Sequence, residues 1–541
     1  MQFLPSHKRA GTRISEDLSV AKSIMPTGSK VFRVSAAVFL IAALGFLYRF
    51  LFIAPFVPTE GNGIGDSLLN LAPGQRMYQG EMIYRDVFEF LTPGTALVNF
   101  VMFKIFGLRP WIPDLLALLM GLALAAIGIA ISRKLMHPML ALLPSAVFIV
   151  SERAFLNDPT HHWYSVLATL AAIAVLLERR TPVRIAAAGM FCGLCACFTQ
   201  TSGLAVVVGF AVFLWWESRQ RHEDWRGLLR KEAWLLTSFF ATFLAVIAYF
   251  ISEAGPARFF WCTVVFVLKY HSAEAPANKL MVMMAEFPVL TSLRAFLYSF
   301  AHWLFLFAVT PLIFILFFGR YWWKSSRKPF EYWERPMLVA IVGFFMLLSI
   351  APAPDGFRMA VTAFPALILL VWFLDSPRKL AQGLAAAITV ATLVIALYSV
   401  AAHEPQPVGI MATPHGELAF TDPTLYQEDL WIQQHTHPSE YFYEPLSQDA
   451  YFYLDLRNPT PLSSIENNGY TPPEQVADII RGLDRHRVRY ILWSRQALDV
   501  PQSSKNPSND YLGPLRTYVH SHYTVVKSFA NSDQAWENNA G

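Results

Sequence analysis

Long apolar segments recur through most of this chain and constrain its fold more than any other feature. A helix crosses a bilayer with about 17 to 25 mostly apolar residues. Segments of this kind lie near 31–53, 112–132, 163–178, 183–199, 202–216, 233–252, 296–318, 358–375 and 380–401, with shorter ones near 91–107, 137–151 and 336–351. The 541 residues are 54% hydrophobic and only 15% charged, which is outside the usual range of soluble domains. The sequence therefore predicts a mainly α-helical, polytopic membrane protein.

Basic residues indicate how the segments alternate, because Lys and Arg concentrate in cytoplasmic loops. They cluster at 133–134, 179–184, 219–231, 320–335 and 378–379. If all these loops are cytoplasmic, 112–132 is a span and 93–107 is an amphipathic helix on the outer surface. That gives about 11 transmembrane helices with outer-face juxtamembrane helices. In the alternative, 91–107 spans the membrane, 133–134 lies outside and Asp158 lies inside.

The two ends of the chain differ from the middle. Residues 1–30 are rich in Lys and Arg and precede a segment too long for a signal-peptide core, which predicts a cytoplasmic tail and a retained signal anchor in a cell (inner) membrane. After the transmembrane module of residues 31–401, residues 402–541 carry 9 basic and 17 acidic residues and few apolar runs. This change predicts a small periplasmic or extracellular α/β domain.

Within this domain, 440–445 has the pattern of a strand, 473–486 that of an amphipathic helix, and 488–494 that of a buried strand. No glycine-rich phosphate loop follows either strand, which argues against a nucleotide site. The basic residues are scattered over loops instead of clustering with aromatic residues, so no nucleic-acid partner is expected. All four cysteines lie in apolar stretches, which favours buried thiols over disulfides or metal chemistry (Cys192, Cys195, Cys197 and Cys262).

The preferred topology brings six segments to the outer face, where we expect them to line one cavity. They are loop 55–111, loop 152–162, the turn around Gln200 and Thr201, loop 253–295, loop 352–357 and the chain after about 402. Acidic and basic residues near a bilayer are costly, so their accumulation in these loops indicates function.

Asp66 is the first candidate catalytic residue. It precedes a helix-like stretch whose leucines, 68, 69 and 71, are expected to rest on the membrane while Asp66 faces the cavity. A carboxylate at a helix N-terminus stays ionised and can accept a proton from an attacking hydroxyl. The alternative is an N-cap aspartate without a catalytic role. Farther along the same loop, Arg85 and Asp86 are candidates for substrate binding, with an ion pair between Asp86 and Arg76 or Arg85 as the alternative.

Asp158 is the second candidate catalytic residue, in a short loop beside His161 and His162. We expect it to bind the acceptor, or to share a water or metal with Asp66, and His162 to contact substrate. The alternative is that Asp158 caps the helix that begins at Pro159. A divalent cation, Mg or Mn, held by Asp66, Asp158 and His161 is a weaker hypothesis, because adjacent side chains rarely converge on one ion.

Three basic residues are candidates for binding a phosphate. Arg358 stands at the outer end of a span, where it either snorkels to the surface or meets an anion. The planar guanidinium makes paired, charge-assisted hydrogen bonds to phosphate. Lys269 and His271 are further candidates of the same kind.

With these residues in place, the chain resembles the C-type fold of integral-membrane glycosyltransferases, which include lipopolysaccharide-core and lipid A sugar transferases and protein mannosyltransferases. The resemblance covers about residues 30 to 400 and depends on the order of motifs. These are Asp66 after the first span, GEMIYRDVFEFLTPG at 80–94, FKIFG at 103–107, RKLM at 133–136, Asp158, and GFRMAVTAFPALILL at 356–370.

The resemblance implies transfer of a sugar from a polyprenyl-phosphate donor to a lipid, glycan or protein acceptor at the outer face, with membrane lipids around the protein. It implies that Asp66 acts as the base, that Asp158 assists, and that basic residues bind the carrier phosphate. The chain departs from the family pattern at Thr92, where a proline is usual, and at Leu91, where many relatives have a lysine. Phosphate binding therefore shifts to Arg358, Lys269 or Arg85. The alternative function is a transporter or lipid flippase, although neither internal repeats nor broken mid-membrane helices are evident.

Overall fold

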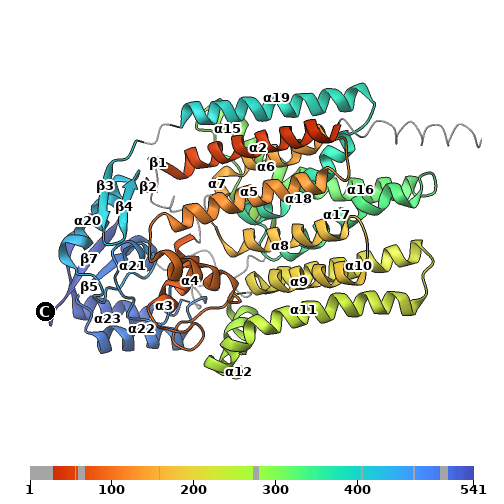
Figure 1. Cartoon of the computed structure of the whole chain (residues 1–541). Helices are drawn as coiled ribbons and strands as arrows, with labels where there is room; N and C mark the ends of the chain where they lie inside the picture. The colour runs from red at the N-terminus through yellow and green to blue at the C-terminus, as the bar shows by residue number, and fades with distance from the viewer. Residues whose placement is uncertain are drawn as a thin grey trace, which may run out of the picture.

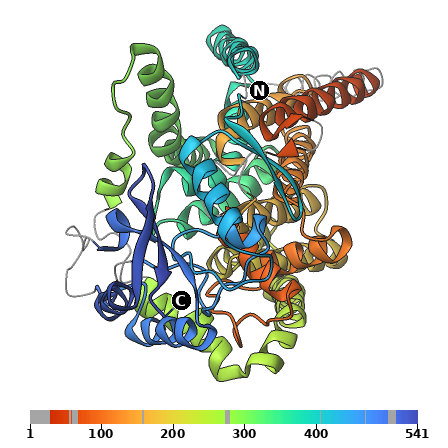
Figure 2. The same ribbon diagram turned by 90° about the vertical axis from the view of Figure 1, so that its left-hand side faces the viewer.

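The computed structural model describes residues 28–54, 57–58, 67–156, 159–271, 279–403, 406–466, 469–499 and 510–540. A bundle of long helices fills one part of the molecule, and a mixed α/β domain covers one end of it (Figure 1). We call this end of the bundle the domain end. Seen from there, the α/β domain lies over the bundle, while α2, α15 and α19 stand at its periphery (Figure 2).

Eight helical segments of the described chain are long and apolar enough to cross a membrane. They are α2 (Gly28–Leu51), α5 (Ile112–Ser132), α10 (Gln200–Gln220), α11 (Trp225–Ala254), the continuous stretch of α15 (Leu293–Leu304), η4 (Phe305–Val309) and α16 (Thr310–Lys324), α17 (Phe330–Ser349), α18 (Gly356–Leu374) and α19 (Lys379–Ala402). Shorter apolar helices lie among them: η1 (Leu140–Leu142) with α6 (Leu143–Ser151), α8 (His161–Leu176) and α9 (Pro182–Phe198). The prediction of a mainly α-helical, multi-pass membrane protein is confirmed.

Helix α4 (Gly94–Phe106) is too short to span a bilayer. Its 13 residues extend about 20 Å at 1.5 Å per residue, whereas the hydrocarbon core is about 30 Å thick. It packs against α3 (Ser67–Tyr78) at the domain end (Figure 1). This position agrees with a surface helix and not with the alternative in which 91–107 crosses the membrane.

The leucines of α3 do not rest on the membrane as the sequence suggested. Leu71 is only 2% exposed and belongs to a core that joins Phe103 of α4 to Phe442 and Phe452 of the α/β domain. The α/β domain supplies the apolar surface that the sequence pattern assigned to lipid. An apolar helix face produces the same sequence pattern whether it packs against protein or against lipid. The sequence could therefore not distinguish the two environments.

Short elements connect the long helices. They are β1 (Phe52–Ala54), β2 (Val57–Pro58), α7 (Arg153–Leu156), α12 (Pro256–Phe260), η2 (Trp261–Val265), η3 (Val267–His271) and α14 (Lys279–Ala285).

The α/β domain combines a hairpin, a three-stranded antiparallel sheet of order β5-β7-β6, and surrounding helices. Its elements are β3 (Gly409–Thr413), β4 (Gly416–Phe420), α20 (Pro423–His435), α21 (Asp449–Tyr453), α22 (Pro473–His486), β5 (Tyr490–Ser494), η5 (Arg495–Asp499), α23 (Gly513–His522), β6 (Tyr523–Ser528) and β7 (Asp533–Asn538). Both the helix predicted at 473–486 and the buried strand predicted at 488–494 are present. The strand predicted at 440–445 is wrong, because this segment makes only isolated bridges, at Tyr441 and Tyr443.

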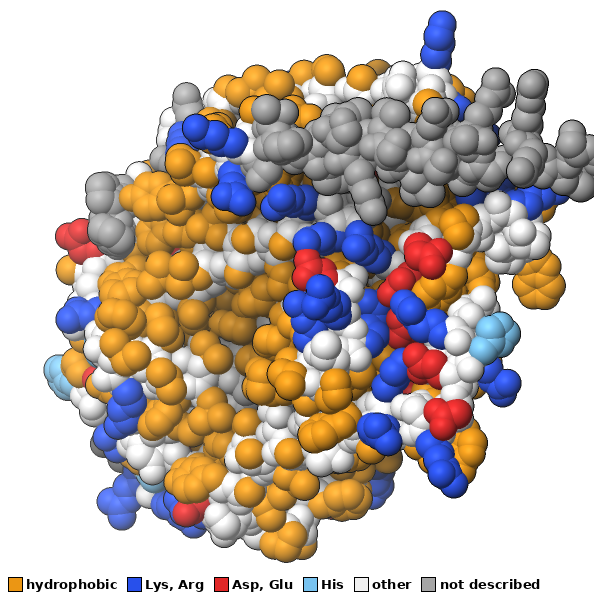
Figure 3. All heavy atoms as spheres, turned by 45° about the vertical axis from the view of Figure 1, so that its right-hand side comes forward, with side chains coloured by type: hydrophobic (Ala, Val, Ile, Leu, Met, Phe, Trp, Pro, Cys, Tyr) orange, Lys and Arg blue, Asp and Glu red, His pale blue; other side chains and the backbone are white. Residues whose placement is uncertain are grey.

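The basic loops gather at the end of the bundle opposite the α/β domain. Figure 3 shows Lys and Arg there, interspersed with Asp and Glu, beside largely hydrophobic flanks. One of these basic residues, Arg180, lies 3.2 Å from Glu217 and 2.9 Å from Glu334. Glu217 is 1% exposed, so the arginine offsets the cost of burying its charge. The grouping of these loops at one end agrees with a single cytoplasmic face.

Candidate active site

A cavity of about 370 Å³ opens at the domain end of the bundle, within the size range of small-molecule sites. All six segments expected at the outer face contribute to its wall. The lining residues include Leu69, Asn70, Glu89, Phe90, Leu91, His161, His162, Gln200, Thr201, His271, Pro352, Arg358, Ser463 and Tyr470. We call it the active-site cavity.

Three long helices begin at this cavity. Helix α8 begins at His161, α10 begins at Gln200, and α18 begins at Gly356, and each contributes first-turn residues to the cavity wall. The first N–H groups of a helix have no partner within the helix, and the helix dipole is positive at this end. The N-termini of α8 and α10 carry no side-chain cap and therefore provide a preorganised site for an anion, whereas N–H groups at the start of α18 already bond carboxylates.

Arg358 lies in the first turn of α18 and lines the cavity. Its guanidinium forms an ion pair with Asp355 and donates to the carbonyl oxygen of Ala353 over 3.4 Å. The Asp355 carboxylate also accepts from the Arg358 backbone N–H at 2.8 Å and so caps the helix. Glu286 accepts from the Gly356 N–H at 2.9 and 2.7 Å with its two oxygens. These contacts fix the arginine at the edge of the cavity.

The polar residues of the wall are held by contacts between segments far apart in the chain. His161 Nδ1 is 3.2 Å from Asn70 Oδ1, which links α8 to α3. Gln200 Nε2 donates to the Phe90 carbonyl at 3.0 Å, while its Oε1 is buried without a hydrogen-bond partner among the described residues. Buried polar atoms are normally paired, so this oxygen suits a donor group from a ligand. The His271 ring lies between aromatic neighbours, with burial lowering the pKa of its imidazole.

Glu89 is a cavity residue that the sequence analysis did not single out. Its half-buried carboxylate lines the wall and accepts from the Leu91 N–H at 2.9 Å. Burial raises the pKa of Glu89 to about 7, because removal from water disfavours the charged form. The sequence did carry a signal, since Glu89 stands between Phe88 and Phe90 in an apolar run.

Comparisons with known proteins agree with this architecture. No protein-family model and no curated protein sequence matches the chain. Among solved structures, ArnT from Cupriavidus metallidurans bound to undecaprenyl phosphate matches with a TM-score of 0.56 at 13% identity, over 93% of this chain and 98% of ArnT. ArnT in the apo state gives 0.56 at 14% identity. The chain has the C-type glycosyltransferase fold. The oligosaccharyltransferase AglB from Archaeoglobus fulgidus, in complex with an inhibitory peptide and a dolichol-phosphate, is similar with a TM-score of 0.49 at 13% identity, over 92% of this chain and 74% of AglB.

Within this C-type fold, the two candidate catalytic aspartates, Asp66 and Asp158, lie outside the described residues. The described chain resumes close to both of them. Leu69 and Asn70 in the first turn of α3, and His161 at the start of α8, line the active-site cavity.

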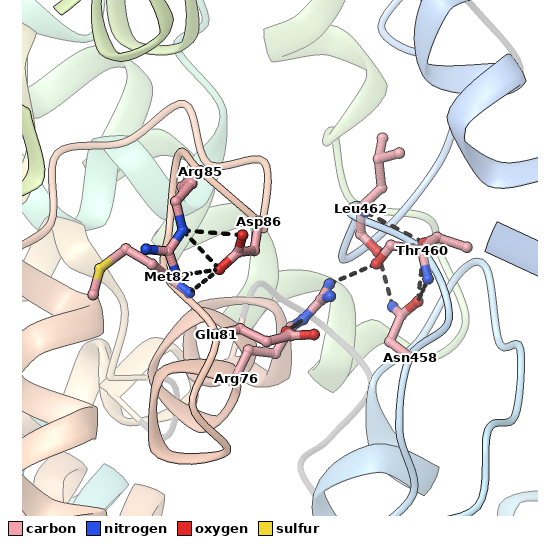
Figure 4. A network of polar contacts seen from close by, with 8 residues as sticks. All are labelled: Arg76, Glu81, Met82, Arg85, Asp86, Asn458, Thr460 and Leu462. Carbon is pink, nitrogen blue, oxygen red and sulfur yellow. Dashed lines mark hydrogen bonds and ion pairs between the residues drawn. The ribbon is translucent and has the colours of Figure 1, made fainter. Parts of the chain in front are cut away.

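Arg85 and Asp86 do not line the cavity. Arg85 Nη2 lies 2.8 Å from Asp86 Oδ2, and Arg85 Nη1 lies 3.0 Å from Glu253. Asp86 also accepts from the Met82 N–H at 2.9 Å, which closes a tight turn (Figure 4). The hydrogen bond from Arg85 lowers the pKa of Asp86. The ion pair that the sequence offered as the alternative is present, and substrate binding by Arg85 and Asp86 stays a prediction.

Arg76 connects the same loop to the α/β domain. It pairs with Glu81 and donates through Nη1 to the Thr460 carbonyl at 2.7 Å (Figure 4). Asn458 organises the receiving segment, since its Nδ2 donates to the Leu462 carbonyl at 2.8 Å and its Oδ1 accepts from the Thr460 N–H at 2.8 Å. The loop and the α/β domain therefore form a continuous wall.

The loop contacts the helix bundle through a turn formed by Thr92, Pro93 and Gly94. Thr92 Oγ1 donates to the Ala196 carbonyl at 2.7 Å. A Cβ at Gly94 would lie 2.6 Å from the Cys197 carbonyl oxygen, so only glycine permits this approach. Leu91, at the position where the family pattern has a lysine, lines the cavity without supplying a charge.

Lys269 is separated from the other basic candidates. Arg358 and His271 line the active-site cavity, whereas exposed Lys269 lines an adjacent cavity of about 320 Å³ together with Arg258. The three residues therefore do not form one phosphate site.

A metal site is not formed by the described residues, in which no group of three or more His, Cys, Asp or Glu could hold an ion. Of the three residues proposed as ligands for Mg or Mn, only His161 is described, and its Nδ1 is engaged with Asn70. The four cysteines are free and buried, as the sequence predicted.

Proposed function

We propose that this protein is a glycosyltransferase of a cell (inner) membrane. It transfers a hexose or pentose from a polyprenyl-phosphate carrier to a lipid, glycan or protein acceptor on the outer side. The observation that carries this proposal is the convergence of the uncapped N-termini of α8 and α10 with Arg358 on one cavity, in a chain with the C-type fold. ArnT, which has this fold, is bound to undecaprenyl phosphate in one of its structures.

In the proposed reaction, Asp66 accepts the proton of an acceptor hydroxyl. The resulting oxygen attacks the anomeric carbon of the donor sugar. The bond between this carbon and the phosphate oxygen breaks, and its electron pair leaves with the polyprenyl phosphate. Asp158 orients the acceptor, while Arg358 and the helix N-termini stabilise the negative charge that develops on the leaving phosphate.

The position of the charged groups favours a transferase over a transporter or flippase. A transporter binds its substrate near the middle of the membrane, at broken helices. In this cavity the polar residues stand instead at helix beginnings, with His161 at the start of α8, Gln200 at the start of α10 and Arg358 in the first turn of α18. A substrate held there meets its acceptor at the membrane surface.

Binding of the carrier tests the proposal directly. Purified full-length protein in nanodiscs is expected to bind radiolabelled undecaprenyl phosphate saturably, and to release this product from a panel of undecaprenyl-phosphate hexoses and pentoses when acceptor extract is added. Absence of saturable binding would overturn the proposal. Carrier movement between leaflets without any sugar transfer would favour the flippase.

Glu89 gives the carrier affinity a pH dependence. Below about pH 7 its carboxyl group is neutral, and above that pH its charge repels the carrier phosphate. Between pH 6 and pH 8 we expect the affinity of the wild type for undecaprenyl phosphate to fall by about threefold to tenfold relative to Glu89→Gln. Since the ligand titrates identically in both assays, the ratio isolates Glu89. A ratio that stays constant with pH would show that this carboxylate does not face the phosphate.

A further inference from the structure

The cavity of about 320 Å³ beside the active-site cavity is the strongest unassigned feature of the molecule. Phe88 lines both cavities, so its side chain forms part of a shared wall. The Phe88 N–H donates to the Pro461 carbonyl at 2.8 Å, which fixes this wall to the α/β domain. The opposing sides come from the segment α12–η3 and from the start of α22, which meet at the domain end (Figure 2). We call this space the second cavity.

Aromatic rings form one side of the second cavity. Trp261 and Tyr270 line it together with Phe88, and the Phe88 and Trp261 ring centroids are 5.9 Å apart. Such rings offer broad apolar faces with a polar edge. A sugar ring, which has apolar C–H groups on one face and hydroxyls around its edge, fits this surface.

Planar polar side chains form the opposite side. Glu474, Gln475 and Asp478 come from the first turns of α22 and line the cavity. Gln475 is only 5% exposed, and its Oε1 has no hydrogen-bond partner among the described residues. Because buried polar atoms are normally paired, this oxygen marks the place of a ligand donor such as a hydroxyl. A carboxylate or amide can accept from two neighbouring hydroxyls of one sugar ring.

The charges of the second cavity balance. Arg258 and Lys269 line it together with the carboxylates of Glu474 and Asp478. Each cation also lies over an aromatic ring of the same wall, Arg258 over Trp261 at 5.0 Å and Lys269 over Tyr270 at 4.9 Å. One helix, α22, begins at the second cavity, and its first two turns carry Glu474 and Asp478. These carboxylates offset the positive end of the helix dipole, so the second cavity does not concentrate the positive charge that suits a phosphate. It suits an uncharged, hydroxyl-rich ligand.

We infer that the second cavity is the acceptor subsite and that it binds a neutral sugar unit. This inference rests on the proposed function and names its acceptor class, a glycan or a glycan-bearing molecule. One sugar of the acceptor stacks on Trp261 and Tyr270 and hydrogen-bonds Gln475, and the next reaches past Phe88 into the active-site cavity. There its hydroxyl meets the donor.

Saturation-transfer NMR on the full-length protein in nanodiscs tests the inference with the methyl glycosides of glucose, galactose, mannose and N-acetylglucosamine. At least one glycoside is expected to receive saturation from the wild type. Trp261→Ala and Gln475→Leu are each expected to lower this signal by about fivefold or more, because an aromatic face or a buried hydrogen bond is lost. Trp261→Phe keeps a ring in place and is expected to retain most of the signal. Trp323→Ala is the matched control, since Trp323 is 71% exposed and lies in the last turn of α16, at the end of the bundle opposite the α/β domain (Figure 1).

Undecaprenyl phosphate binding, measured in the same samples, separates the two proposals. If the wild type binds the carrier but no glycoside, or if Trp261→Ala and Gln475→Leu leave the glycoside signal unchanged, the acceptor subsite is overturned and the proposed function stands. If glycosides bind at Trp261 but the carrier does not bind, the proposed function is overturned, and with it the role of this sugar site as an acceptor subsite. A serine-containing hexapeptide that receives saturation at Trp261 in place of the glycosides would overturn the assignment of a sugar.

Discussion

Asp66→Asn is expected to lower the turnover of polyprenyl-phosphate sugar by about 10²- to 10⁴-fold, the usual contribution of a positioned general base. Asparagine keeps the size of the side chain but cannot accept the proton of the acceptor hydroxyl. Affinity for undecaprenyl phosphate is expected to change little, because the helix N-termini and Arg358 remain. The measurement is the release of undecaprenyl phosphate from donor, alongside an equilibrium binding assay.

The same substitution at Asp86 provides the comparison. Asp86 is exposed, pairs with Arg85 and does not line the active-site cavity, so Asp86→Asn is expected to retain most of the turnover. Wild-type turnover in purified Asp66→Asn protein would refute the assignment of the base. If Asp86→Asn lost as much activity as Asp66→Asn, the loop would act through its shape and not through one carboxylate.

Arg358→Gln is expected to weaken undecaprenyl phosphate binding by about tenfold to a hundredfold, since a hydrogen bond to a charged group contributes about 1.5–3 kcal/mol. The substitution removes a positive charge from the first turn of α18, where Asp355 and Glu286 stay behind as negative groups. Their repulsion adds to the loss. Titration with radiolabelled undecaprenyl phosphate, at fixed pH and ionic strength, measures the effect.

Two other arginines test whether the effect is local. Arg489 is exposed on the α/β domain and pairs with Glu537 at 3.0 Å, so Arg489→Gln is the control for a generic loss of charge. Arg85→Gln is expected to resemble this control, because Arg85 lies outside the cavity in its pairs with Asp86 and Glu253. A larger loss at Arg85 than at Arg358 would move the phosphate site to the first outer loop.

Much of the fold could be predicted because it follows from local pattern. Apolar segments of spanning length indicate membrane helices without reference to their neighbours. The helix Pro473–His486 was recognisable because Val476, Ile479 and Leu483 recur on one face, and these residues are buried in the structure. The strand predicted at 440–445 failed because strand pairing depends on a partner elsewhere in the chain, and this segment meets its neighbours at single residues.

The candidate site was predictable only in outline. The basic residues of the loops at the other end predicted which six segments lie together on the outer face. Residues from all six segments line the active-site cavity. Only Tyr270 lies between Lys269 and His271 in the sequence, so sequence alone grouped the two basic residues. Helix η3 directs them to different cavities, which only the structure shows.

Sequence alone also named Arg85 as a candidate and did not name Glu89. Arg85 forms ion pairs with Asp86 and Glu253 outside the cavity. Glu89 lines the cavity, and burial raises the pKa of its carboxyl group.

The sequence by itself determined that this chain crosses a membrane many times, and that its charged residues fall into two groups at opposite ends. It did so because hydrophobic length and charge bias act on each segment separately. Only the tertiary structure decided which outer residues share a cavity, that Leu71 of α3 faces protein and not lipid, and that Phe88 lies between two adjacent cavities. Those outcomes depend on contacts between residues far apart in the chain, which no local pattern specifies.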